Sequence, residues 1–380
     1  MAAMTSRLPF IDALKAVAVQ LIVLHHLAFY GPMSDHAYVL APALFSWLSQ
    51  DARTAVQVFL VIGGFLAARS LAPAGRLVSA QPLRLLLKRY LKLVIPYLAA
   101  LSIGVVCAAV ARAMMTHDSV PDWPTLPQFI AHSLLLHGIL GYEGLSAGVW
   151  YVAIDFQLFA LLLAALWLAR GLGRGTAGVA VLGLLLVATL ALASLYHFNR
   201  DPAWDNWALY FFASYALGVL TYWAANPQHA PGWLVPIVAA VLVALLLDYR
   251  LRVAVALAVA LALGVASRSG LLEIWPRSRL LAYLGKISYS VFLIHFPVCL
   301  LINGLLVRFA SADPWINLTG VLFAWLASLV AGALFYRFVE SPSQRGFRRL
   351  CVATDISLRL AATLPPAGQS SSECHRPPPA

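Results

Sequence analysis

The sequence predicts an all-α protein, a polytopic transmembrane helix bundle of about ten spans with both termini in the cytoplasm. Of the 380 residues, 62% are apolar and 11% are charged, and the mean hydropathy is +0.83. Soluble proteins contain roughly 45–50% apolar and about 25% charged residues. The apolar residues also lie in long blocks, and about 20 of them suffice to cross a bilayer as a helix. These observations exclude a disordered or collagen-like chain and argue against a soluble domain.

Ten apolar blocks are candidate spans. They are residues 9–30, 54–72, 91–112, 147–169, 177–197, 207–225, 232–249, 252–268, 283–307 and 315–337. The short neighbours 232–249 and 252–268 form either two spans or one re-entrant unit. The stretch 127–141 is too short to cross, so we expect a re-entrant or interfacial segment. We assign residues 1–350 to one membrane domain, and we expect the polar, Pro-rich residues 351–380 to be a disordered cytoplasmic tail.

The net charge of +11 is explained largely by the way Lys and Arg residues are distributed over the predicted loops. Nineteen Lys and Arg residues fall on one set of alternating loops and termini, and six fall on the other set. Because cytoplasmic loops are enriched in Lys and Arg, this asymmetry places both termini in the cytoplasm. The charge therefore does not require a nucleic-acid partner. The four cysteines include no Cys-x-x-Cys pair and no His/Cys cluster, so we expect neither a disulfide framework nor a metal site.

Ionisable residues inside the first apolar block are candidate functional residues, because each costs on the order of 2.5–3.5 kcal/mol to insert. Lys15 and His26 are eleven residues apart, which places them on one helix face about 16 Å apart along the axis. Asp12 lies within ion-pair reach of Lys15. His25 points about 80° away from Lys15 by the same geometry. The alternative is that Asp12 and Lys15 form a snorkelling pair and that the histidines only pack in the bundle.

Two further ionisable residues lie in later spans. His295 is expected near the middle of the membrane, and Pro297 frees the carbonyl of Leu293 close to it. Asp155 is expected about two turns inside its span, where a lone carboxylate needs a partner from another helix, such as a histidine or lysine. We expect these residues and His26 to meet in one site, although His295 could instead be a buried histidine bonded to a carbonyl.

A second group of candidates is basic. Arg69, Lys88, Arg89 and Lys92 lie around a segment that enters the membrane from the cytoplasm. Such a cluster suits a phosphate-rich ligand, because charge-assisted hydrogen bonds to phosphate are strong. Binding of anionic membrane lipids explains the cluster equally well.

Six segments, in order, resemble the acyltransferase 3 family of integral membrane O-acyltransferases, which includes O-antigen and exopolysaccharide acetylases. They are Asp12-Ala-Leu-Lys15 with His26, Ala55–Leu66, Lys88–Tyr97, Trp150-Tyr-Val-Ala-Ile-Asp155, Leu284–Pro297 and Tyr336-Arg-Phe-Val-Glu340-Ser-Pro342. The last two are the most specific. The chain departs from the family pattern where Lys15 replaces arginine, Asp155 replaces glutamate, Gln57 replaces a common acid and Gly63 replaces serine.

The resemblance implies transfer of an acyl group, most often acetyl, from cytoplasmic acyl-CoA to a hydroxyl of a glycan or lipid-linked sugar, within the bacterial inner membrane. It makes His26 a general base or acyl carrier, with Lys15 on the donor, Asp155 orienting a histidine and His295 as a second site histidine. Arg69, Lys88, Arg89 and Lys92 would bind acetyl-CoA or another acyl-CoA. Asp12, His25, Trp150, Ser288, Tyr289 and Glu340 are further candidate site residues.

Two other classes of function remain open at this point. A proton-coupled transporter of a glycan or small anion would also use intramembrane Asp and His residues, although the sequence has no inverted repeat of the kind that many transporters show. A structural or lipid-binding membrane protein would use them only for stability. The sequence specifies neither the acceptor, nor acetyl against succinyl as the donated group, nor the oligomeric state.

Overall fold

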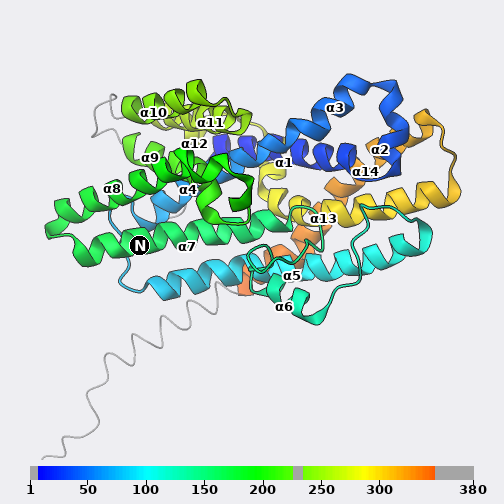
Figure 1. The fold of residues 1–380 in the computed structure, drawn as a ribbon, viewed down its shortest axis with the longest axis horizontal. Helices are drawn as coiled ribbons and strands as arrows, with labels where there is room; N and C mark the ends of the chain where they lie inside the picture. Colours follow the sequence, from blue (N-terminus) through cyan, green and yellow to red (C-terminus); the bar gives the residue numbers. More distant parts are fainter. Residues whose placement is uncertain (1–6, 226–233, 347–380) are drawn as a thin grey trace, which may run out of the picture.

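The computed structural model describes residues 7–225 and 234–346, and this part of the chain contains helices and no β-strand (Figure 1). The α-helices are α1 (Pro9–Phe29), α2 (Pro32–Ala37), α3 (Pro42–Gln50), α4 (Val56–Leu71), α5 (Pro82–Met114), α6 (Leu126–Ser133), α7 (Val149–Leu172), α8 (Gly175–Tyr196), α9 (Ala208–Ala224), α10 (Val235–Leu247), α11 (Leu251–Arg268), α12 (Leu271–Ile274), α13 (Arg279–Phe309) and α14 (Pro314–Phe335). A 3-10 turn, η2 (Ala52–Ala55), precedes α4, and a π-helical turn, η6 (Tyr336–Glu340), follows α14.

The prediction of an all-helical membrane bundle is confirmed within the described residues. Eight helical segments are long and apolar enough to cross a membrane, and α9 and α10 are shorter apolar helices. These two correspond to the predicted spans 207–225 and 232–249, which are therefore shorter than expected. Nearly every residue of α9 is buried, as is typical of a helix that is apolar on all sides. The predicted tail, 351–380, lies outside the described residues.

Helix α5 is longer than the predicted span 91–112, because its basic segment is helical too. Pro82 stands in the first turn, where its missing N–H has no intrahelical partner to lose. The Leu, Arg and Lys residues that follow are good helix formers. The apolar stretch 127–141 contains only the eight-residue α6, which is too short to cross and packs on α5. The Tyr90 hydroxyl donates to the Ser133 carbonyl over 2.8 Å.

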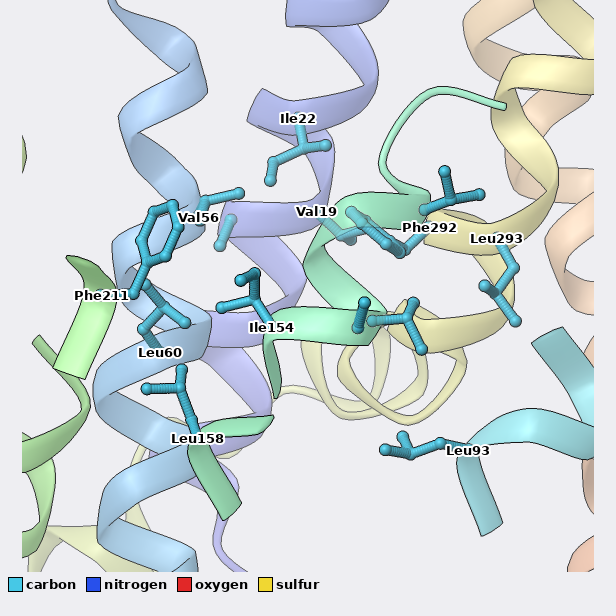
Figure 2. Packing of buried hydrophobic residues seen from close by; sticks show 14 of the residues in the cluster. Val19, Ile22, Val56, Leu60, Leu93, Ile154, Leu158, Phe211, Phe292 and Leu293 are labelled. Carbon is cyan, nitrogen blue, oxygen red and sulfur yellow. The ribbon is translucent and has the colours of Figure 1, made fainter. Parts of the chain in front are cut away.

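The packing of the bundle brings together helices that lie far apart in the sequence. Helix α13 packs against α1, α5 and α14, and α4 packs against α9. At the contact between α4 and α9, a Cβ atom on Gly64 or Gly218 would lie 1.9 Å from a backbone oxygen of the other helix. Small residues thus let these two backbones touch. Figure 2 shows the centre of the core, where α1, α4, α7 and α13 contribute Val19, Val56, Ile154 and Phe292.

Candidate active site

A cavity of about 610 Å³ lies between α1, α5, α7, α13 and η6. We call it the basic cavity, because five Lys and Arg side chains line it against three Asp and Glu side chains. The cations are Arg7, Lys15, Arg89, Lys92 and Lys286, and the acids are Asp12, Asp155 and Glu340. This excess of positive charge fits an anionic ligand such as a phosphate ester.

Asp155 pairs with an arginine rather than with a histidine or lysine. Its Oδ2 atom lies 2.5 Å from Nη2 of Arg89, and the guanidinium group of Arg89 also covers the ring of Phe159. From the sequence we expected Asp155 to orient a histidine, and the structure contradicts this expectation. The carboxylate of Asp155 instead neutralises the partly buried guanidinium group of Arg89, which we had expected to bind CoA. Asp155 itself is buried, and pairing is what makes a charge tolerable there.

Lys15 forms the predicted ion pair with Asp12, with 3.1 Å between Nζ and Oδ1. Asp12 also accepts a hydrogen bond from Nε of Arg7 over 2.9 Å, so that one carboxylate holds two cations. All three side chains line the basic cavity. The position of Lys15 on α1 leaves it about three helical turns from His26, which lies in a different cavity.

The turn η6 holds Glu340 against α13. Glu340 accepts hydrogen bonds from the hydroxyl of Ser290 over 2.5 Å and from the amide of Gln344 over 2.8 Å. The predicted residue Ser288 also lines the basic cavity, but its hydroxyl donates to the Gly285 carbonyl. The hydroxyl of Tyr289 donates to the carbonyl of Leu93 on α5 over 3.0 Å. These bonds connect the two most specific sequence segments and fix one wall of the basic cavity.

The two predicted histidines of α1 and α13 are in direct contact. Nδ1 of His26 lies 2.7 Å from Nε2 of His295, and the two rings are within 8° of parallel. Nδ1 of His295 lies 2.8 Å from the carbonyl oxygen of Phe292, which can only accept, so this nitrogen carries the proton. In neutral His295, Nε2 is then the acceptor, and His26 must donate from Nδ1. This chain leaves Nε2 of His26 unprotonated, as a general base requires.

His26 lines a second cavity of about 310 Å³, which we call the histidine cavity. Its other polar lining residues include His25, Ser49 and Arg53, with Trp150 among the aromatic ones. Nδ1 of His25 lies 3.0 Å from the carbonyl oxygen of Leu48, so Nδ1 donates and Nε2 is free of a proton. The cavity therefore presents imidazole nitrogens as acceptors for a hydroxyl group.

Phe292 is the residue that the linings of the two cavities share among the described residues. Its ring packs edge-on against Tyr151, with 5.4 Å between the ring centroids. Tyr151 lines the basic cavity and its neighbour Trp150 lines the histidine cavity. Gly148 has φ +81°, and a Cβ there would lie 2.8 Å from Cζ of Phe292. A glycine at the start of α7 thus leaves room for the ring of Phe292.

A family model for an acyltransferase domain, Acyl_transf_3, matches residues 8–337. The chain belongs to the acyltransferase 3 family. In a curated Caenorhabditis elegans protein, "Regulator of hypoxia-inducible factor 1", a 70-residue segment is 33% identical; it covers 18% of this acyltransferase and 14% of that protein. The chain thus matches about a seventh of that relative's length. No solved structure matches this acyltransferase significantly.

The structure distributes the predicted site residues of this membrane acyltransferase over two cavities. Lys15 and Asp155 lie in the basic cavity, whereas His26 lines the histidine cavity with His295 behind it. Contrary to the expectation that His26, His295 and Asp155 meet in one site, Asp155 therefore lies in a different cavity from His26. Of the predicted CoA ligands, Arg89 and Lys92 line the basic cavity, and Lys88 does not. Arg69 lines a separate cavity that also contains Glu273.

Several residues of the two cavities were not among the predicted ones. Arg7 and Lys286 add charge to the basic cavity, and Arg53 adds charge to the histidine cavity. Lys286 lies within the resembling segment of α13, at the start of the predicted span 283–307, where a lysine also fits the cytoplasmic interface. Arg7 and Arg53 lie at helix starts, where a single sequence does not distinguish a cavity from solvent. In the described part of the chain, no three His, Cys, Asp or Glu side chains form a group that could hold a metal ion.

Proposed function

We propose that this membrane acyltransferase moves an acyl group, acetyl in the simplest case, from acyl-CoA to a hydroxyl group of a glycan or lipid-linked sugar. The observation that carries the proposal is the hydrogen-bonded chain from the Phe292 carbonyl through His295 to His26. It leaves a free imidazole lone pair at the wall of a cavity large enough for a small molecule. The Lys and Arg asymmetry favours an orientation in which the basic cavity faces the cytoplasm. The family resemblance supports a location in the bacterial inner membrane.

In the proposed reaction, Nε2 of His26 removes the proton of the acceptor hydroxyl as the oxygen attacks the thioester carbonyl. The new C–O bond forms and the C–S bond breaks. The leaving CoA thiolate takes the proton from the imidazolium form of His26, which restores the neutral histidine. His295 stabilises the imidazolium through its Nε2 lone pair and holds the ring in one orientation.

The donor occupies the basic cavity in this proposal. Lys92, Lys286 and Arg7 offer charge to the CoA phosphates, and Asp155 limits the free charge of Arg89. Lys15 is too far from His26 along α1 to polarise the reacting carbonyl, so it binds a more distant part of the donor. The thin pantetheine arm carries the thioester past Phe292, and burial of the reacting groups limits hydrolysis.

Mass spectrometry of surface glycans and lipid-linked sugars from cells with and without the gene tests this function. The proposal predicts acyl groups on a sugar hydroxyl only when the gene is present. Glycans of unchanged mass but altered amount outside the cell would contradict it and would support the proton-coupled transporter instead. Replacing labelled acetate by labelled succinate as the precursor in the same cells identifies the donated group.

A further inference from the structure

Among the described residues that line the histidine cavity, Arg53 is the one that carries a permanent charge. Arg53 lies on the turn η2, directly before α4. No Asp or Glu is among the described residues that line this cavity. Asp51 is only two residues away in the chain, yet the described residues provide no ion pair for Arg53. Its guanidinium group is thus available to a ligand without the loss of an existing partner.

Arg53 is a cation on the predicted non-cytoplasmic side of the protein, where Lys and Arg residues are few. The predicted topology leaves only six Lys and Arg residues on this side. A cation here is therefore not explained by the rule that enriches Lys and Arg in cytoplasmic loops. The planar guanidinium group matches carboxylate and phosphate oxygens with paired hydrogen bonds. The basic cavity, in contrast, balances most of its cations with acids.

The other walls of the histidine cavity suit a sugar ring. Trp150 is 39% exposed, lines the cavity and stacks on Phe211. Aromatic faces pack well against the C–H face of a pyranose. Ser49 and the free Nε2 atom of His25 supply hydrogen-bonding groups for sugar hydroxyls. The volume of about 310 Å³ lies at the lower end of small-molecule sites, which suits one sugar residue rather than a long segment of polymer.

We propose that the acceptor sugar carries an anionic oxygen group, which Arg53 binds while a hydroxyl of the same sugar faces Nε2 of His26. This inference rests on the proposed function and adds the chemical class of the acceptor to it. A carboxylate, as in a uronic acid, and a phosphate ester share the chemistry that Arg53 recognises. Arg53 is then a specificity residue for the acceptor and takes no part in donor binding.

Three probe acceptors test the inference on purified protein in lipid nanodiscs with labelled acetyl-CoA: methyl glucoside, methyl glucuronide and methyl glucoside 6-phosphate. We expect wild-type kcat/KM to be about tenfold higher for at least one anionic probe than for methyl glucoside. The better of the two anionic probes identifies carboxylate or phosphate. Arg53→Gln should remove this preference through the acceptor KM, Arg53→Lys should keep part of it, and Arg308→Gln, a cation of the same predicted side, should keep all of it.

The results that contradict the inference differ from those that contradict the proposed function. A wild-type preference for methyl glucoside would overturn the inference. So would an equal loss with all three probes in Arg53→Gln, because that pattern indicates a general role in the reaction. CoA release without acylation of either anionic probe would overturn it as well. Absence of both CoA release and acylation with every probe would instead contradict the proposed function.

Discussion

The backbone carbonyl of Phe292 accepts a hydrogen bond from Nδ1 of His295 over 2.8 Å, while the ring of Phe292 lines both cavities. One turn of α13 therefore sets the protonation pattern of the two histidines and also contributes to the walls of both cavities. The same turn thus affects both the chemistry at His26 and the access of the acyl donor and water to the reacting groups. His295 and Phe292 therefore each lead to a separate prediction.

Replacement of His295 by alanine should lower kcat for acyl transfer about a hundredfold or more, because His26 loses the group that orients it and stabilises its protonated form. The KM for acyl-CoA should change little, since His295 does not line the basic cavity. Steady-state kinetics of purified protein give both values. A kcat close to that of the wild type would show that His26 acts without this hydrogen bond.

Replacement of Phe292 by alanine should raise the ratio of CoA released to acyl group transferred, because water gains access to the thioester between the cavities. Phe296→Ala is the matched control. Phe296 is also buried on α13, one turn further on, but lines neither cavity. Both variants should lose stability, since Phe→Ala in a core typically costs about 3–5 kcal/mol. Equal ratios in the two variants would rule out a separating role for the ring.

Replacement of Asp155 by asparagine should lower the melting temperature, because Arg89 is left partly buried without its counter-charge. Loss of one partner of a buried ion pair typically costs about 3–5 kcal/mol, and the partial exposure of Arg89 places this pair toward the low end. The double variant Asp155→Asn with Arg89→Gln should recover part of the loss, as the pair is coupled. Thermal unfolding in detergent measures all three variants. Additive losses would show that the pair contributes little.

Replacement of Lys92 by glutamine should raise the KM for acetyl-CoA about tenfold or more, because a hydrogen bond to a charged group typically contributes at least about 1.5 kcal/mol to binding. Lys88→Gln is the control, because Lys88 lies one turn earlier on α5 and does not line the basic cavity. Acyl-transfer kinetics at saturating acceptor give the two values. The same rise in both variants would indicate a general effect of positive charge at the membrane surface instead of a donor site.

Much of the fold could be predicted from the sequence, because a bilayer demands long apolar helices and these are visible as blocks. The ends of helices were harder to predict. The blocks mark where apolar residues stop, but α5 continues through Arg84 and Lys88, which favour helix as strongly as leucine does. Helix α9 is both short and almost wholly buried, and the apolar block alone showed neither its exact ends nor its burial.

The sequence singled out candidate residues of the site but not how they pair. Costly intramembrane groups identified His26, His295 and Asp155, yet a sequence does not give the rotation of one helix against another. Asp155 therefore pairs with Arg89 rather than with a histidine, and the two histidines pair with each other. For the same reason, nothing in the sequence distinguished Ser290, which binds Glu340, from its neighbour Ser288.

The most direct test of the account is acyl transfer by a His26→Gln variant that inserts and folds normally, measured beside a His36→Ala control. His36 is exposed on α2 and lines neither cavity. The account predicts that His26→Gln still binds acetyl-CoA but transfers almost no acyl group, while His36→Ala transfers at the wild-type rate. Wild-type transfer by His26→Gln would contradict the assignment of His26 as the base.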